Sequence, residues 1–209
     1  MRSLPLTLFP LLLVASSASV LDGCSLSPPR TRLYVLTALP QSDRVPNTVL
    51  TGSGTVGVGP VELPQYTDRL QIVTGNTGHE LSRAPFDNWA EPLEANFARV
   101  LAENLSLLLA TDQVVVFPWQ GPLSLDYQVI VEVTKFLGEP GGQASLETLW
   151  RIVGKNGKDA IAIEKSSFSE PVGARNYEAL AAALSRMVAA LSRDIATTIT
   201  TIASNPSHR

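Results

Sequence analysis

The sequence predicts an α+β fold, with a mostly antiparallel sheet and two long helices packed on one of its faces. Three observations carry this prediction. Residues 125–134 alternate apolar and polar side chains, which is the period of a half-buried strand. The pair Asn156-Gly157 joins two further strand-like runs, as in a β-hairpin. Two segments, 89–110 and 177–203, repeat apolar residues at helical spacing.

The composition is that of a globular protein. The 209 residues are 44% hydrophobic and 17% charged, which excludes a disordered chain. The formal net charge of −3, with scattered basic residues, gives no surface for nucleic acid. The expected mature chain, residues 24–209, has 186 residues, which is roughly the length of one domain, and we place that domain at residues 32–205.

The N-terminal segment has the features of a secreted lipoprotein. Residues 1–23 combine Arg2 with an apolar run, as in a signal peptide, and this run is too short for a confident transmembrane helix. It ends in Leu-Asp-Gly-Cys, which resembles a bacterial lipobox, although Asp22 stands where a small uncharged residue is usual. We expect cleavage before Cys24, lipidation of its sulfur and a short tether over residues 24–31. The alternative is an ordinary signal peptide beside a buried cysteine.

Short strands are predicted before the first helix. The strand-like runs are residues 32–36, 55–63 and 70–73, with 80–83 as a further candidate. Residues 38–54 are rich in Pro, Gly and Ser and are expected to form a loop. Within the second run the apolar phase shifts at Gly59-Pro60, which predicts a bulge or kink.

The first helix is predicted between residues 89 and 110. Asp87 or Asn88 is expected to cap its start, with Glu91 three residues after Asn88 as in a capping box. Pro92 is compatible with a helix only in the first turn, which places the start near Trp89.

The second half predicts an antiparallel meander followed by the second helix. Its strands are residues 114–117, 125–134, 144–153 and 159–168. The final helix covers about residues 177–203, with Asn176 as its cap and Pro206 beyond its end.

No pattern of residues points to catalysis or metal binding. His79 and His208 lack spaced Cys or His partners, and no G-x-S-x-G motif is present. The segment from Gly52 to Gly57 matches G-x-G-x-x-G, but it precedes a strand, whereas a dinucleotide loop must open a helix. Asn104 fits a glycosylation pattern but lies on the predicted helix. We therefore expect no enzymatic activity, no cofactor and no metal.

Two motifs resemble those of a known family. The first lies in residues 56–73, where a Gly-Pro strand leads into a Pro-x-Tyr-x-Asp-Arg connector at residues 64–69. The second is Trp-Ala-Glu-Pro-Leu at residues 89–93, followed by helix residues Phe97, Leu101, Asn104 and Leu105. In this order they resemble the ABC-type transport auxiliary lipoproteins of the PqiC/YmbA type, over essentially the whole mature chain.

The resemblance implies a function that composition and periodicity do not give. It implies a non-enzymatic lipoprotein on the periplasmic face of a Gram-negative outer membrane, and Ser25 after the lipidated cysteine is compatible with that location. The implied partners are a periplasm-spanning MCE-domain protein and an inner-membrane transport component, in a system for lipid traffic and envelope integrity. A ring of identical subunits is also implied. Two alternatives stay open: a lipid carrier with its own apolar cavity, and an envelope enzyme.

The connector supplies candidate residues for partner binding or self-association. Tyr66, Asp68 and Arg69 are expected on a surface loop, and Tyr and Arg are frequent at interface hot spots. Trp89 is a further candidate at the predicted helix start. The alternatives are a locally satisfied Asp68–Arg69 turn with Tyr66 packed on the domain, and a Trp89 side chain that belongs to the core.

Overall fold

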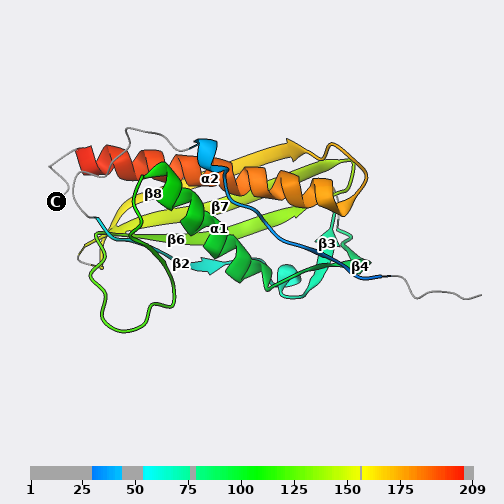
Figure 1. The fold of residues 1–209 in the computed structure, drawn as a ribbon, viewed down its shortest axis with the longest axis horizontal. Coiled ribbons are helices and arrows are strands. Elements are labelled where there is room, and N and C mark those ends of the chain that lie inside the picture. Colours follow the sequence, from blue (N-terminus) through cyan, green and yellow to red (C-terminus); the bar gives the residue numbers. More distant parts are fainter. Residues whose placement is uncertain (1–29, 44–53, 76–78, 156, 205–209) are drawn as a thin grey trace, which may run out of the picture.

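The computed structural model describes residues 30–43, 54–75, 79–155 and 157–204. Cys24, the expected signal peptide and most of the expected tether lie outside these ranges. The described residues form a three-stranded sheet, a five-stranded sheet and two α-helices (Figure 1). This is the predicted α+β class, although one sheet was expected and two are present.

The five-stranded sheet has the order β5-β2-β6-β7-β8. Its strands are β2 (Val56–Glu62), β5 (Val114–Val116), β6 (Tyr127–Gly138), β7 (Gln143–Gly154) and β8 (Ala160–Pro171). The antiparallel meander β6-β7-β8 confirms the prediction for these three strands. The meander was expected to include residues 114–117, and this was wrong, because β5 pairs in parallel with β2 at the sheet edge. A three-residue apolar strand gives no signal of its direction; the direction follows from the preceding helix, which carries the chain back along the sheet.

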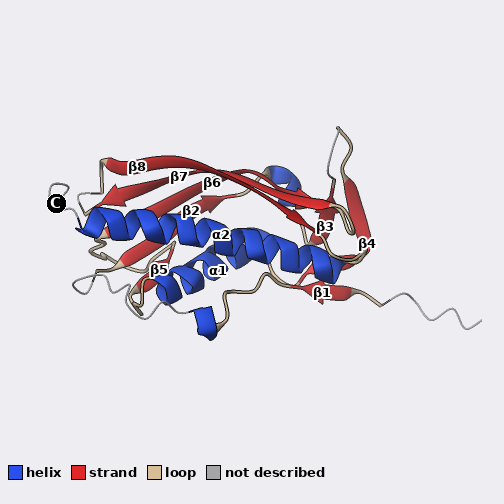
Figure 2. Cartoon of the chain, turned by 90° about the horizontal axis from the view of Figure 1, so that it is seen from above, coloured by secondary structure: helices blue, strands red, loops and turns tan. Residues whose placement is uncertain are grey.

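Helices α1 (Leu93–Leu108) and α2 (Tyr177–Ser204) cover one face of this sheet (Figure 2). The core lies between the two layers. Alternate residues of β6 point into it, so that Val129 and Val131 are fully buried. From α1, Phe97 meets Phe136 of β6 edge to face, with ring centroids 5.3 Å apart. The helix-covered face was predicted from the apolar stripes, and the structure confirms it.

The smaller sheet has the order β1-β4-β3, with β1 (Arg32–Tyr34), β3 (Gln71–Thr74) and β4 (Ser82–Trp89). Here the prediction for the first helix was wrong at its start, because Trp89 ends β4 and α1 begins only at Leu93. Pro92 occupies the N-cap position without a side-chain cap. Asp87 is unavailable as a cap, since its carboxylate binds Arg32 and Tyr34 across the sheet.

Three local predictions are confirmed. The register of β2 against β6 shifts between Val58 and Val61, at the expected irregularity. Gly157, in the turn between β7 and β8, has a φ of 67°, as a tight hairpin requires, while Asn156 lies outside the described residues. The Asn176 side chain accepts a 2.8 Å hydrogen bond from the Ala179 amide and so caps α2.

Neither α1 nor α2 combines the length and the apolar character that a membrane-crossing helix needs, and the same holds throughout the described ranges.

Candidate docking site

The two motifs that carry the family resemblance meet at one pocket. This pocket has a volume of about 210 Å³ and lies between the connector and the start of α1. It is lined by Leu63, Pro64, Thr67, Asp68, Arg69, Leu70, Pro92, Leu93 and Glu94. Residues more than twenty positions apart in the chain therefore form its two walls. Sequence spacing alone could not place them together.

The connector is held in shape by its own backbone. It contains a short 3-10 helix, η2 (Gln65–Thr67), in which the Thr67 amide donates to the Pro64 carbonyl at 2.8 Å. The Thr67 hydroxyl donates to the same carbonyl at 2.7 Å, and Thr67 is buried. The Arg69 amide in turn donates to the Thr67 carbonyl at 2.7 Å. These bonds fix the direction in which the next side chains leave the surface.

Tyr66 points away from the pocket and fastens the connector to the sheet. Its hydroxyl oxygen accepts a 3.1 Å hydrogen bond from the backbone N–H of Phe136, at the far end of β6. Burial raises the pKa of the Tyr66 hydroxyl above its ordinary value, and the hydrogen bond from Phe136 partly opposes this shift. The half-buried position favours the interpretation in which Tyr66 packs on its own domain.

Asp68 and Arg69 are exposed and stand on the rim of the pocket. Within the described part of the chain, no ion pair joins them to each other or to another residue. The Asp68–Arg69 turn is therefore held by backbone hydrogen bonds, and both charged groups remain available. Together with Glu94 they surround apolar walls that include Leu70 and Leu93.

Trp89 lies in the core, where only 4% of it is exposed. Its backbone N–H donates to the Leu70 carbonyl at 2.7 Å, and the next amide, of Ala90, donates to the Tyr34 carbonyl at 2.8 Å. The second motif thus ties β4 to the segment before β3 and to β1. The burial favours the core interpretation of Trp89 over a direct surface contact.

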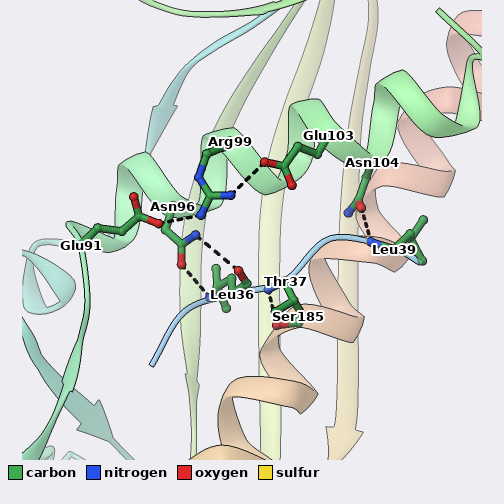
Figure 3. Close-up of polar contacts among 9 residues, drawn as sticks. All are labelled: Leu36, Thr37, Leu39, Glu91, Asn96, Arg99, Glu103, Asn104 and Ser185. Carbon is green, nitrogen blue, oxygen red and sulfur yellow. Dashed lines mark hydrogen bonds and ion pairs between the residues drawn. The ribbon is translucent and has the colours of Figure 1, made fainter. Parts of the chain in front are cut away.

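Buried polar side chains hold the segment that follows β1 against both helices (Figure 3). The Asn96 amide group accepts from the Leu36 N–H at 2.7 Å and donates to the Leu36 carbonyl at 3.5 Å. Two turns further along α1, the Asn104 side-chain oxygen accepts from the Leu39 N–H at 2.7 Å. From α2, the Ser185 hydroxyl accepts from the Thr37 N–H at 3.1 Å. The chain that leads from the expected tether is therefore fixed to both helices before it reaches η1 (Gln41–Asp43).

Asn104 also joins the two helices, because its amide nitrogen donates to the Ser192 hydroxyl of α2 at 3.0 Å. It is fully buried, so the glycosylation pattern at this position is structural. Sequence reasoning named Asn104 only as part of a motif and did not assign a role to Asn96. The available signal was that both asparagines fall on the apolar stripe of α1. A polar side chain buried there needs hydrogen-bond partners, so its position indicates a structural role.

On the helix surface, Arg99 joins Glu91 of the second motif to Glu103, at 2.6 and 2.8 Å (Figure 3). The pKa of the Arg99 guanidinium is raised, first by the hydrogen bond to Glu91 and then by that to Glu103. All three side chains are substantially exposed, so this network adds little to stability.

A second surface was missed by sequence reasoning and lies at the edge strand β5. Phe117 and Trp119 follow this strand and meet edge to face, with ring centroids 5.2 Å apart. They pack against β2 where it lacks side chains: a Cβ added to Gly57 would lie 3.1 Å from the Trp119 ring, and one added to Gly59 would lie 2.8 Å from the Phe117 Cβ. Gly57, the last glycine of the G-x-G-x-x-G match, therefore makes room for Leu125 and Trp119, and no helix follows it.

The larger hollows of the surface are open grooves. One, of about 550 Å³, runs along α2 beside the end of α1 and is lined by Asp43, Leu108, Arg193, Ala196, Thr197, Thr200 and Thr201. Another, of about 530 Å³, lies between α1 and β5 and includes Arg99 and Glu103. In the described ranges no three His, Cys, Asp or Glu side chains converge as metal ligands would.

Two solved structures share the fold. One, described as an uncharacterized protein, is 20% identical, with a TM-score of 0.66 over 82% of this chain and 99% of its own. The other is protein XCC0632 of the DUF330 family from Xanthomonas campestris, which is 17% identical, with a TM-score of 0.63 over 81% of this chain and 96% of its own. At these identities the likeness concerns the fold alone. No curated protein matches the chain.

The family is shown by a match over most of the chain. Residues 34–196 match the family described as the ABC-type transport auxiliary lipoprotein component. This range starts at the last residue of β1 and ends within α2, so it contains β2 to β8, α1, most of α2 and both walls of the pocket. The resemblance read from the two motifs is thereby confirmed, and the chain belongs to the ABC-type transport auxiliary lipoprotein family.

Proposed function

We propose that this protein is a non-enzymatic outer-membrane lipoprotein that docks an MCE-type lipid transport system at the membrane and supports envelope integrity. Cys24 would carry the lipid anchor, and the folded domain would face the periplasm. The partners would be a periplasm-spanning MCE-domain protein and an inner-membrane transport component. Support comes from the family, whose members are transport auxiliary lipoproteins, and from the lipobox-like end of the N-terminal segment.

One observation carries the docking role: the two motifs of the resemblance converge on an exposed pocket with a charged rim. Apolar walls surrounded by charges are the arrangement of a small protein-recognition site. Asp68 and Arg69 suit this role because their charges are exposed and not consumed by ion pairs in the described part of the chain. Tyr66 and Trp89 would contribute indirectly, by fixing the connector and the strand behind it.

The pocket is too small to enclose a phospholipid, at about 210 Å³ against the several hundred that even a drug-sized ligand fills. The two larger grooves are open to solvent, and charged side chains stand among their apolar ones, so neither encloses an acyl chain. The arrangement therefore supports a docking component better than a lipid carrier. The proposed ring of identical subunits rests on the family resemblance.

The docking role is tested by removing the two rim charges together. Asp68→Ala with Arg69→Ala should weaken the affinity for the MCE-domain partner, or for a second copy of the chain, by about tenfold or more. Less partner should then co-purify, or the mass of the self-assembled form should fall. The thermal midpoint should stay near that of the unmodified protein, because both side chains are exposed.

The matched control is Asp112→Ala with Arg151→Ala, which makes the same charge change at exposed positions away from the pocket. It should leave binding unchanged. Unchanged binding by both variants would remove the pocket from the docking site, and loss of binding by both would show that the effect is not specific to the pocket.

A further inference from the structure

We propose that the outer face of the β1-β4-β3 sheet rests on the phospholipid surface of the membrane that holds the lipid anchor. Leu33 and Phe86 would enter the apolar boundary of the bilayer, and Arg30 and Arg83 would face the lipid phosphates. The inference rests on the proposed lipidation of Cys24, and it adds the orientation of the domain.

The small sheet has one face committed to the protein and one that is not. Towards α2, the Arg32 guanidinium and the Tyr34 hydroxyl both bind Asp87, each at 2.8 Å, and the Tyr34 ring lies 6.4 Å from that of Tyr177. Side chains alternate across a strand, so Leu33, between Arg32 and Tyr34, points to the opposite, outer face.

Phe86 is a second exposed apolar side chain of the small sheet. In the parallel pairing of β1 with β4, Leu33 lies opposite Asn88. Phe86 precedes Asn88 by two positions, in the stretch of β4 where the register against β3 shifts. Leu33 is 64% exposed and Phe86 is 40% exposed. An aromatic and an aliphatic side chain exposed on neighbouring strands are a pair that a lipid surface would bury.

Exposed apolar residues concentrate at this end of the molecule. Nine large hydrophobic side chains are exposed among the described residues, and five of them belong to the small sheet or flank it, namely Leu33, Val35, Leu70, Leu81 and Phe86. The end of α2, where Ser204 lies, is at the opposite end of the domain (Figure 2).

Two arginines at this end can face the phosphates of a lipid surface. Arg30 and Arg83 are exposed and form no ion pair within the described ranges, whereas Arg32 is paired with Asp87. Glu80, two residues before β4, is an exposed acid at the same end, so the positive excess is small. Long arginine side chains can place their charge at phosphate level while their stems lie along apolar groups.

The tether brings the same end of the domain to the membrane. Only residues 25–29 separate Cys24 from Arg30, and an extended chain of that length spans no more than about 20 Å. β1, which Arg30 precedes, lies with β3 and β4 at one end of the molecule (Figure 2). An anchor this close gives a weak surface contact a high effective concentration, so a few side chains are enough to orient the domain.

The full-length lipoprotein provides a direct test. Its only native cysteine is Cys24, so once that sulfur is acylated a cysteine introduced elsewhere is the sole thiol for a fluorescent label. Labels at Leu33→Cys and Ile163→Cys would be compared, since these positions are equally exposed, at 64%, and Ile163 lies on β8 of the large sheet. The protein is placed in phosphatidylethanolamine vesicles that contain phosphatidylglycerol and a lipid-borne quencher.

Quenching should be at least about twofold stronger at Leu33→Cys than at Ile163→Cys, and Arg30→Gln with Arg83→Gln should reduce that difference. Equal quenching at both positions on protein that floats with the vesicles would overturn the proposed orientation. The proposal would also be overturned if the Leu33→Cys label were shielded from water without being quenched and the mass of the protein doubled. A second copy of the chain would then cover this face. Protein that fails to float with the vesicles would instead contradict the lipid anchor itself.

Discussion

At the scale of single residues, buried polar groups decide how the N-terminal segment is held. Asn104 uses both ends of its amide, accepting from the Leu39 N–H and donating to Ser192. Asn96 does the same for both backbone groups of Leu36. A buried amide with every partner in place specifies one arrangement of three segments, because each alternative leaves a polar group without a partner.

Asn104→Ala should therefore destabilise the fold. The Leu39 N–H would lose its acceptor in a partly buried position, and we expect the free energy of unfolding to fall by about 1–3 kcal/mol. Urea unfolding measures this change. The adjacent variant Glu103→Ala removes only an exposed ion pair and should stay within about 0.5 kcal/mol of the unmodified protein. Similar losses in both variants would mean that the Asn104 contacts contribute little.

Tyr66→Phe should change how stability depends on pH. Because burial raises its pKa, the folded state holds the Tyr66 proton more tightly than the unfolded chain does. The stability that the protonated Tyr66 hydroxyl adds is fully present below about pH 10, and it is lost as the pH rises through the pKa of the folded state.

Near neutral pH, Tyr66→Phe should cost about 0.5–1.5 kcal/mol, since the Phe136 N–H loses its acceptor. Above about pH 10 the difference in the free energy of unfolding between Tyr66→Phe and the unmodified protein should become smaller. Urea unfolding at both pH values, with Tyr34 and Tyr177 unchanged in both proteins, measures it. A constant difference at the two values would contradict the assigned role of burial.

At the scale of elements, β2 is shaped by what packs over it. Its valines Val56 and Val58 face the core, while Gly57 and Gly59 leave space on the other side for Trp119 and Phe117. Gly59 has a φ of 117°, which side chains rarely tolerate. The loop after β5 and the irregularity in β2 therefore depend on each other.

Backbone strain at positive φ costs about 1–3 kcal/mol. Gly59→Ala should lower the free energy of unfolding by more than this, because the new Cβ would also clash with Phe117. Gly121→Ala separates the two effects, since Gly121 has a φ of 79° with open space around it. Gly173→Ala has open space and no positive φ, and should be near neutral. Thermal unfolding ranks the three variants. If Gly59→Ala and Gly121→Ala lose equal stability, the contact with Phe117 contributes nothing.

At the scale of the whole molecule, the end of the domain where the described chain begins also carries the candidate docking site nearby. β1 and the connector are joined through β4, since the Trp89 amide binds the Leu70 carbonyl and the Ala90 amide binds the Tyr34 carbonyl. The small sheet and the connector that forms one wall of the pocket are therefore joined by backbone hydrogen bonds.

Cys24→Ser should leave unprocessed precursor or release the domain to the soluble fraction. A lipid anchor contributes about 0.8 kcal/mol for each buried CH₂, far more in total than a few side chains at a membrane surface. Membrane fractionation and the mass of the N-terminal peptide measure the outcome. A matured, membrane-bound Cys24→Ser protein would show that the lipobox interpretation is wrong.

Ser25→Asp should move the lipoprotein from the outer to the inner membrane. In bacterial systems with this type of signal, Asp after the lipidated cysteine retains the protein in the inner membrane, and Ser does not. Density-gradient fractionation distinguishes the two locations. The outer-membrane proposal fails if the unmodified protein already sediments with the inner membrane.

Periodicity in the sequence by itself determined the helices and the antiparallel meander. Residues 125–134 alternate because one face of β6 is buried, and Asn176 caps α2 because a short side chain can reach the free amides of a helix start. The motifs of the connector and of the first helix also determined the family. All of these signals are local, so neighbouring residues are enough to reveal them.

Only the tertiary structure decided how distant segments meet. The separate small sheet, the parallel β2–β5 pair and the start of α1 at Leu93 depend on contacts between residues far apart in the chain. Asp is a residue type that often caps helices, but the Asp87 carboxylate binds Arg32 and Tyr34 instead. The sequence around Asp87 does not reveal these partners. The pocket likewise exists only because β4 brings Pro92 beside the connector. Pairing between distant strands is set by the packing of the whole chain, which local propensity does not contain.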